Sequence, residues 1–217
     1  MNQAAIIERI STIGLVPVLR ATSAKEAITI ADAIIAGGVT VLEITMTVPG
    51  AIHVMQQLAD HHGDRLLIGA GTVLDVETAR SCLLAGAQFI VSPALDVRTI
   101  ELCRRYSAPI MPGALTPTEI VSAWQSGADV VKVFPCSALG GAKYLKALQG
   151  PLPQVQLIPT GGVSLSTAAE FLDAGAFALG VGSDLVDAKA AAEGRTGVIT
   201  ENARKYMEIV QKQRSAK

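Results

Sequence analysis

The chain has 217 residues, and its 18 lysines and arginines against 19 aspartates and glutamates give a formal net charge of −1. Half of the residues are hydrophobic and 17% are charged, which is too apolar for a disordered chain and too balanced for a nucleic-acid-binding protein. The N-terminal segment lacks the basic and apolar regions of a signal peptide, and no apolar run approaches the ~20 residues of a membrane span. We therefore expect a cytoplasmic protein with no nucleic-acid or membrane partner.

Strand-like apolar runs and segments of helical spacing alternate along the chain. The predicted strands are residues 15–20, 39–45, 66–71, 88–92, 109–112, 130–134, 156–160 and 177–182. The predicted helices are residues 23–36, 49–61, 75–85, 96–106, 116–126, 140–148, 164–174 and about 201–214. Five helices begin at residues suited to capping, which are Ser23, Asp75, Asp96, Thr116 and Ser164. This alternation is typical of parallel βαβ units.

A glycine-containing turn recurs where a helix meets the next strand, at Gly37, Gly86, Gly127 and Gly175. These glycines are 49, 41 and 48 residues apart, which corresponds to two strand–helix units each time. A left-handed glycine ends a helix and lets the chain turn sharply. Because no Pro- or Ser-rich linker divides the chain, we predict an α/β fold with a single (β/α)8 barrel domain over residues 1–217. A doubly wound open sheet is the alternative.

Lys132 is unusual because it lies inside a β-branched predicted strand. Strand alternation places Val131 and Val133 on the opposite face, so Lys132 points into the barrel if the valines pack under the helices. Burial disfavours the charged ammonium and favours the neutral amine, which is the nucleophilic form. Lys132 is therefore a candidate nucleophile, and a structural lysine in a buried ion pair is the alternative.

Glu43 is a second ionisable residue in a predicted strand, on the same face as Val41 and Thr45. A carboxylate at the apolar mouth of a barrel can transfer protons during a reaction. It can also simply neutralise Lys132, and one pair of residues can serve both purposes.

Glycine-rich turns follow the last two predicted strands. Thr160-Gly161-Gly162 follows the seventh strand, and Gly182-Ser183 follows the eighth. In (β/α)8 barrels the loops after these two strands often bind phosphate through backbone N–H groups, and glycine permits the close approach. The two turns together predict a phosphate site, although each alone also fits an ordinary turn.

Metal-binding patterns are missing from the sequence. The three cysteines are widely spaced without a CxxC pair, and the three histidines lie in or just after the second predicted helix. We therefore expect no metal and no cofactor. A buried amine, a carboxylate and phosphate-binding loops instead indicate Schiff-base chemistry on a phosphorylated carbonyl compound.

Short motifs spread over about residues 10–212 resemble those of the bacterial class I aldolases that act on 2-keto-3-deoxy-6-phosphogluconate and 4-hydroxy-2-oxoglutarate. The motifs are Leu42-Glu43-Ile44-Thr45, Gly69-Ala70-Gly71-Thr72-Val73-Leu74, Ser92-Pro93, Met111-Pro112-Gly113, Lys132-Val133-Phe134-Pro135, Pro159-Thr160-Gly161-Gly162-Val163 and Gly182-Ser183. They occur in one order along nearly the whole chain, which makes the combination specific even though each motif is short.

The resemblance implies a role for each matching residue. Lys132 would form the Schiff base, and Glu43 would move protons during cleavage. Thr72 would contact the pyruvate carboxylate, with Pro93 and Phe134 as walls of that pocket. The other expected substrate contacts are Thr160 and, for the phosphate, Gly161, Gly162, Gly182 and Ser183. The resemblance also implies a homotrimer.

One position departs from the family pattern. The best-known members carry an arginine four residues after the catalytic glutamate, where it binds the keto-acid carboxylate, and this chain has Thr47 there. Arg20 follows the first predicted strand, and the related 2-keto-3-deoxy-6-phosphogalactonate aldolases have a substrate-contacting arginine at that place. We expect Arg20 to replace the missing guanidinium, since its bidentate fork suits a carboxylate. A salt bridge at the barrel rim is the alternative.

The expected function is cleavage of 2-keto-3-deoxy-6-phosphogluconate to pyruvate and glyceraldehyde 3-phosphate, as in the Entner–Doudoroff route, without a metal. A further candidate substrate is 4-hydroxy-2-oxoglutarate, which would yield pyruvate and glyoxylate. Three alternatives stay open: a galactonate-type aldolase, a phosphate-binding isomerase or synthase of the same barrel that forms no imine, and a non-enzymatic sugar-phosphate sensor.

Overall fold

Short parallel strands form the centre of the structure, which is a computed structural model that describes residues 1–215. The strands are β1 (Leu15–Leu19), β2 (Val41–Thr45), β3 (Leu67–Gly71), β4 (Phe89–Val91), β5 (Ile110–Met111), β6 (Gly113–Ala114), β7 (Val131–Val133), β8 (Leu157–Pro159) and β9 (Leu179–Val181). All of them lie within or overlap the predicted strands, except that β6 extends the fifth predicted strand beyond its expected end.

These strands close into a barrel. They are hydrogen-bonded in the orders β5-β4-β3-β2-β1-β9 and β6-β7-β8, and the neighbouring strands run parallel. A bridge between Thr160 and Gly180 joins the two sheets on one side. On the other side β5 and β6 are separated only by Pro112, so together they form the fifth strand of the barrel. The predicted (β/α)8 barrel is therefore confirmed, and the open sheet is wrong.

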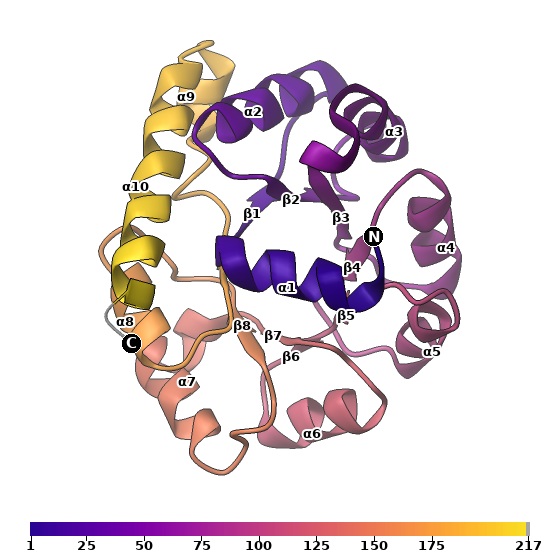
Figure 1. Cartoon of the computed structure of the whole chain (residues 1–217), viewed down its shortest axis with the longest axis vertical. Coiled ribbons are helices and arrows are strands. Elements are labelled where there is room, and N and C mark those ends of the chain that lie inside the picture. The colour runs from indigo at the N-terminus through magenta and orange to yellow at the C-terminus, as the bar shows by residue number, and fades with distance from the viewer. Residues whose placement is uncertain (216–217) are drawn as a thin grey trace.

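Helices cover the barrel: α1 lies across one of its ends, and the others form an outer ring around it (Figure 1). They are α1 (Gln3–Ile13), α2 (Ala24–Ala36), α3 (Ala51–His62), α4 (Val76–Leu84), α5 (Val97–Arg105), α6 (Pro117–Gln125), α7 (Ala142–Gln149), α8 (Ala168–Asp173), α9 (Ala188–Ala192) and α10 (Thr196–Ser215), with 3-10 turns η1 (Gly63–Arg65) and η2 (Cys136–Leu139). The predicted helices correspond to α2 to α8 and α10, whereas the sequence does not predict α1 or α9. None of the helices in the described residues has the length and apolar character needed to span a membrane.

Most of the predicted helix starts are confirmed. Ser23, Asp75, Asp96 and Thr116 each accept a hydrogen bond from a backbone N–H in the first turn of α2, α4, α5 and α6. The prediction for Ser164 is wrong, because α8 begins only at Ala168. Ser164 lies in the preceding loop and is not an N-cap.

The predicted glycine turns are confirmed, with one shift of position. The φ angles of Gly38, Gly86, Gly127 and Gly175 are 93°, 96°, 95° and 93°, so each turn contains a left-handed glycine. In the first turn this residue is Gly38, because the φ of Gly37 is −81°. These turns precede the strands. They therefore lie at the opposite end of the barrel from the loops that follow the strands.

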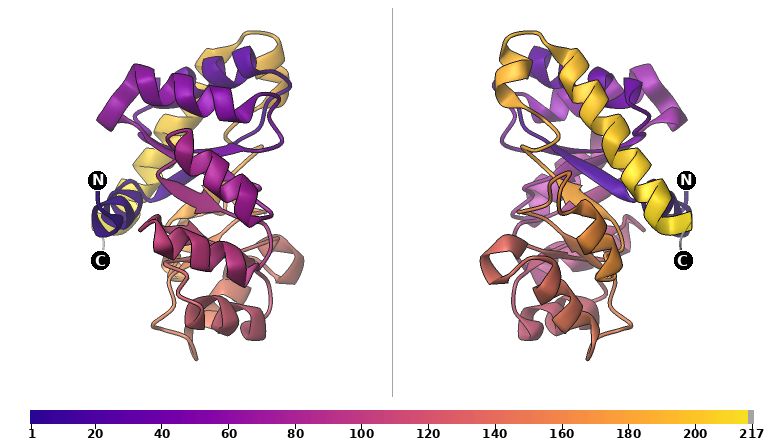
Figure 2. Two further views of the ribbon diagram at one scale, coloured as in Figure 1. Left: turned by 90° about the vertical axis from the view of Figure 1, so that its right-hand side faces the viewer. Right: turned by 90° about the vertical axis from the view of Figure 1, so that its left-hand side faces the viewer.

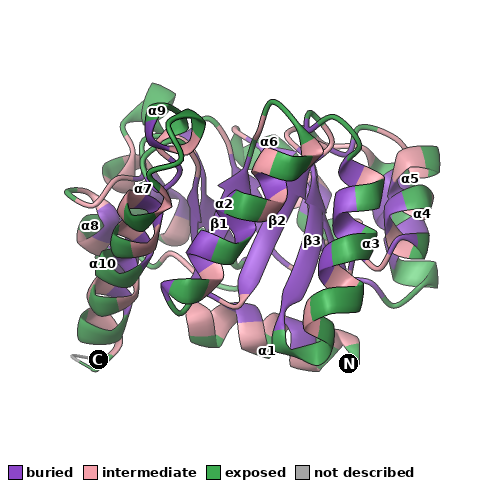
Figure 3. Ribbon diagram, turned by 90° about the horizontal axis from the view of Figure 1, so that it is seen from above, coloured by how far each residue is buried: buried purple, intermediate pink, exposed green. Residues whose placement is uncertain are grey.

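α1 closes the end of the barrel at which the strands begin. Ile6 and Ile10 of α1 pack in one apolar cluster with strand residues that include Val41, Leu67 and Phe89. Figures 2 and 3 show the N-terminus and the end of α10 on this same face. The opposite face, where the strands end, is therefore left for a functional site, as is usual in this fold.

Candidate active site

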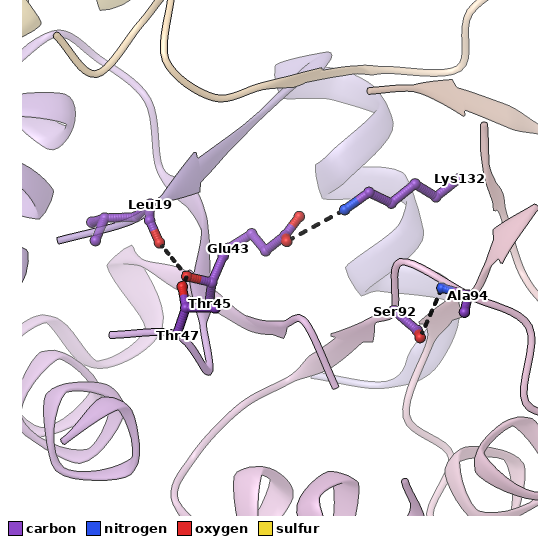
Figure 4. Close-up of polar contacts among 7 residues, drawn as sticks. All are labelled: Leu19, Glu43, Thr45, Thr47, Ser92, Ala94 and Lys132. Carbon is purple, nitrogen blue, oxygen red and sulfur yellow. Dashed lines mark hydrogen bonds and ion pairs between the residues drawn. The ribbon is translucent and has the colours of Figure 1, made fainter. Parts of the chain in front are cut away.

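Lys132 and Glu43 form a buried ion pair inside the barrel. Val131 and Val133 pack in the apolar layer between strands and helices, so strand alternation points Lys132 inward from β7. Its Nζ lies 3.6 Å from Glu43 Oε1, and the two side chains are 7% and 3% exposed. Figure 4 shows them pointing toward one another. The same Nζ lies 5.5 Å from the centroid of the Phe134 ring, within the range of a cation–π interaction.

The Glu43 carboxylate fits beside Gly71 because this glycine has no side chain. A Cβ on Gly71 of the neighbouring strand β3 would lie 2.0 Å from Glu43 Oε1, so any side chain there would displace the carboxylate. Among the described residues, Oε1 is buried and has no hydrogen-bond donor, because 3.6 Å to Lys132 is too long for a hydrogen bond. A buried carboxylate oxygen without a donor is available to exchange a proton with a bound molecule or water.

Two threonine hydroxyls tie the ends of β1 and β2 together. The buried Thr45 Oγ1 donates to the carbonyl oxygen of Leu19 at 3.0 Å and lies 2.7 Å from Thr47 Oγ1 (Figure 4). Thr45 has a single hydroxyl hydrogen, so Thr47 is the donor of the second bond. This fixes the start of the loop that carries the exposed Arg20.

Thr72 and Pro93 lie just beyond the ends of β3 and β4. Thr72 has a φ of 57°, which is uncommon for a residue other than glycine and occurs often at binding sites. Beside Pro93, the hydroxyl of Ser92 accepts a hydrogen bond of 3.3 Å from the N–H of Ala94. Thr72, Pro93 and Phe134 are all only partly buried. They therefore provide accessible surface at the same end of the barrel as the Lys132–Glu43 pair.

Two glycine loops follow β8 and β9. Gly161 and Gly162 have φ angles of 86° and 80°, a conformation that suits glycine. A Cβ on Gly182 would meet no atom within 4 Å, so its backbone faces open space, and Ser183 is exposed. Thr160 is 8% exposed and bridges to Gly180, which joins the two loops at their base. This arrangement leaves backbone of both loops accessible to an anion.

Arg20 is exposed after the end of β1. Within residues 1–215 its side chain makes no hydrogen bond or ion pair. The salt bridge considered as its alternative role is therefore not formed in this part of the chain. Its guanidinium is free to take an anionic ligand.

Histidine and cysteine side chains do not gather at the strand ends. Within the described part of the chain, no group of three or more His, Cys, Asp or Glu side chains is placed to hold a metal ion. Cys82, Cys103 and Cys136 are buried and free, and burial raises the pKa of their thiols to about 11, 12 and 11. The ionisable groups at the site are therefore an amine, a carboxylate and a guanidinium.

One family of known proteins is similar to this chain over most of its length. A sequence model of the family described as KDPG and KHG aldolase matches residues 6–202, which is most of the chain. This chain belongs to the KDPG and KHG aldolase family. The 2-dehydro-3-deoxy-phosphogluconate aldolase of Treponema pallidum is 35% identical over 205 residues, which cover 94% of this chain and 97% of the relative. The 2-dehydro-3-deoxy-6-phosphogalactonate aldolase of Escherichia coli is 34% identical over 198 residues, which cover 91% of this chain and 96% of the relative.

A solved structure supports the same assignment for this aldolase. A crystal structure of KDPG aldolase from Legionella pneumophila, with pyruvate captured as a covalent carbinolamine intermediate, matches with a TM-score of 0.85 and 31% identity. The match covers 94% of this chain and 97% of that one. The chain is therefore a class I aldolase, a lyase that breaks a carbon–carbon bond. The family decides against the isomerase, synthase and sensor alternatives.

The structure of the aldolase gives structural roles to three residues to which the sequence assigns none. Thr45 and Thr47 brace the end of β1, and Gly71 makes room for Glu43. Thr45 and Thr47 are visible in the sequence as polar residues at a strand end, but Gly71 has no signal of its own. Its effect depends on a side chain that reaches it from the neighbouring strand.

Proposed function

We propose that this class I aldolase cleaves 2-keto-3-deoxy-6-phosphogluconate to pyruvate and glyceraldehyde 3-phosphate, with Lys132 as the nucleophile and without a metal or other cofactor. The observation that carries the proposal is the buried Lys132–Glu43 pair at the open end of the barrel, 3.6 Å apart. The name of the Treponema pallidum relative and the covalent intermediate of the Legionella pneumophila structure support the substrate and the chemistry.

The proposed reaction begins at the C2 ketone. Lys132 passes a proton to Glu43, and its neutral amine attacks C2 to give a carbinolamine. The carbinolamine hydroxyl leaves as water with the proton returned by Glu43, which gives a protonated imine and the Glu43 carboxylate. Glu43 then accepts the proton of the C4 hydroxyl, directly or through water, while the C3–C4 bond breaks. The electron pair of that bond moves into the imine, which becomes an enamine, and C4 leaves as the aldehyde. Protonation of the enamine at C3 and hydrolysis release pyruvate and return the amine of Lys132.

The remaining site residues are proposed to bind substrate. Thr72 would contact the carboxylate, and Arg20 would pair with it, because a guanidinium binds a carboxylate with two parallel hydrogen bonds. Pro93 and Phe134 would wall the pyruvate portion. The proposed contacts of the sugar and its phosphate are Thr160, Gly161, Gly162, Gly182 and Ser183.

A second substrate is supported by the arginine itself. Thr47 stands where an arginine is expected from the family resemblance, and Arg20 is free of partners within residues 1–215. Both features resemble the galactonate-type aldolases, so the C4 epimer 2-keto-3-deoxy-6-phosphogalactonate, which appears in the name of the Escherichia coli relative, is the second candidate substrate. Comparing kcat/KM for the two epimers distinguishes these substrates. The phosphate-free 4-hydroxy-2-oxoglutarate is a third candidate substrate.

We also propose that the chain acts as one cytoplasmic domain over residues 1–217 and assembles as a homotrimer.

Trapping with pyruvate and borohydride tests the proposed chemistry. Borohydride reduces the imine to a stable amine, and mass spectrometry of peptides should place the adduct on Lys132. Lys132→Met should form no adduct and lose turnover while it keeps its fold. Lys146→Met, a matched change of an exposed lysine on α7, should behave like the wild type. An adduct at another lysine, or none in the wild type, would overturn the proposed mechanism.

A further inference from the structure

Asp184 joins two loops that are far apart in sequence. It lies directly after Ser183 in the loop that follows β9. Its Oδ2 accepts a hydrogen bond of 3.1 Å from the N–H of Leu165, which belongs to the loop that follows β8. The same oxygen accepts a bond of 2.5 Å from the hydroxyl of Tyr206 on α10. One carboxylate oxygen therefore connects both glycine loops to the C-terminal helix.

On the side of α10, the connection is anchored by the buried side chain of Tyr206. Tyr206 is fully buried in the main apolar core, and α10 packs against α2 and α8 on the outside of the barrel. Burial and the nearby charge of Asp184 raise the pKa of the Tyr206 phenol, so its hydroxyl stays protonated and remains a donor. One turn earlier, Asn202 Nδ2 lies 3.4 Å from the carbonyl oxygen of Asp184 and 3.5 Å from that of Leu185. Two successive turns of α10 thus hold the loop after β9.

On the side of Leu165, the connection extends to Gly162 through hydrogen bonds within the loop after β8. The Thr167 hydroxyl donates to the carbonyl oxygen of Gly162 at 2.9 Å. The same hydroxyl accepts a bond of 2.9 Å from the N–H of Ser164, the residue before Leu165. A constraint on Leu165 is therefore transmitted to the glycine backbone by short, consecutive hydrogen bonds.

We propose that Asp184 and Tyr206 are positioning residues that hold the Gly161-Gly162 loop and the Gly182-Ser183 loop at the separation needed to bind the phosphate of the substrate. The inference rests on the proposed function, in which these loops bind phosphate. An anion site built from two loops binds well only if the loops are ordered beforehand, because ordering them on binding costs affinity. Neither residue needs to contact the phosphate, and neither takes part in the chemistry at Lys132.

The test separates phosphate binding from chemistry. In Tyr206→Phe we expect the KM of the phosphorylated substrate to rise about fivefold with little change in kcat. The Kd of inorganic phosphate, measured by calorimetry, should rise by a similar factor. The pyruvate concentration that half-saturates borohydride trapping at Lys132 should stay at its wild-type value. Asp184→Ala should give the same pattern, and the double variant should be no worse than Asp184→Ala alone, because both changes remove one connection.

Tyr144→Phe is the matched control. It also removes a tyrosine hydroxyl that donates a hydrogen bond to a loop, but its acceptor is the backbone carbonyl of Leu115 in a different loop. Its phosphate Kd should equal that of the wild type. An equal rise of the phosphate Kd in this control, a parallel rise in the pyruvate requirement of Tyr206→Phe, or an unchanged phosphate Kd in Tyr206→Phe would each overturn the inference. A failure of the proposed function would show differently, as a wild-type protein that forms no adduct at Lys132 or cleaves no phosphorylated keto acid.

Discussion

Glu43 Oε1 occupies the space in which a side chain on Gly71 would lie, since a Cβ at residue 71 would be 2.0 Å from that oxygen. The two residues are on neighbouring strands β2 and β3, whose backbones are hydrogen-bonded and cannot easily move apart. A methyl group at position 71 must therefore displace the carboxylate. The absence of one side chain is thus a requirement for the position of the proposed proton-transfer group.

Gly71→Ala should lower kcat about 100-fold, because a shift of a reacting group by about 1 Å costs that much in rate. The measurement is the rate of pyruvate release in a coupled assay, with circular dichroism to check the fold. Gly197→Ala is the control, since a Cβ at that position in α10 meets no atom within 4 Å. Wild-type kcat in a folded Gly71→Ala variant would show that the position of Glu43 is not critical.

Glu43→Gln keeps the shape of the side chain but removes its ability to accept a proton. We expect kcat to fall by about 10²- to 10⁴-fold, the usual effect of losing a general acid–base group. Trapping with pyruvate and borohydride should become slower but should still label Lys132. Glu170→Gln, an exposed change on α8, serves as the control and should leave both rates as they are. A Glu43→Gln variant with normal turnover would assign proton transfer to another group.

The buried cysteines predict a loss of stability in mild alkali. Burial raises the pKa of Cys103 to about 12, whereas an unfolded cysteine has a value of about 8.5. The folded state therefore binds more protons between these values, so this contribution to the free energy of unfolding is complete below about pH 8.5 and is lost as the pH rises toward about 12. Urea unfolding at pH 8 and pH 10 should show a smaller loss of stability in Cys103→Ala than in the wild type. Equal losses in the two proteins would contradict the assignment.

The sequence predicts the barrel because its strands are buried on both faces and appear as continuous apolar runs. Lys132 and Glu43 are visible for the same reason, since a charged residue is an exception in such a run. Alternation along the strand places Lys132 inside the barrel once Val131 and Val133 are assigned to the face under the helices. The distance of 3.6 Å between the two charged atoms depends on how the whole barrel closes, because β2 and β7 are not neighbours.

Features that depend on contacts between residues far apart in the chain could not be predicted from the sequence. Ile6 and Ile10 are the buried residues of α1, and they pack against strand residues such as Phe89 that lie far along the chain. The left-handed conformation of Thr72 is not indicated either, because such a position usually carries glycine. The link between Asp184 and Tyr206 joins residues 22 positions apart in different elements. In each case the local sequence pattern is ordinary, and the contact forms only when the barrel closes.

Arg20 and Thr47 allow a test of how the keto-acid carboxylate is bound. Arg20→Ala should raise the pyruvate concentration that half-saturates borohydride trapping about tenfold, because a charge-assisted pair of hydrogen bonds is lost. Thr47→Arg in the Arg20→Ala background should recover part of this loss, since it restores a guanidinium at the position suggested by the family resemblance. Arg204→Ala, an exposed change on α10, should have no effect.

The effect of Arg20→Ala on the two C4 epimers shows whether Arg20 binds the carboxylate or the sugar portion of the substrate. If Arg20 binds the carboxylate, the C4 epimers share that contact, and kcat/KM should fall by the same factor for both. If the pyruvate requirement stays normal in Arg20→Ala while the KM of the phosphorylated substrate rises, Arg20 contacts the sugar portion instead. The carboxylate would then be held by Thr72 and the backbone alone, and the ratio of kcat/KM for the two epimers should change in the same variant.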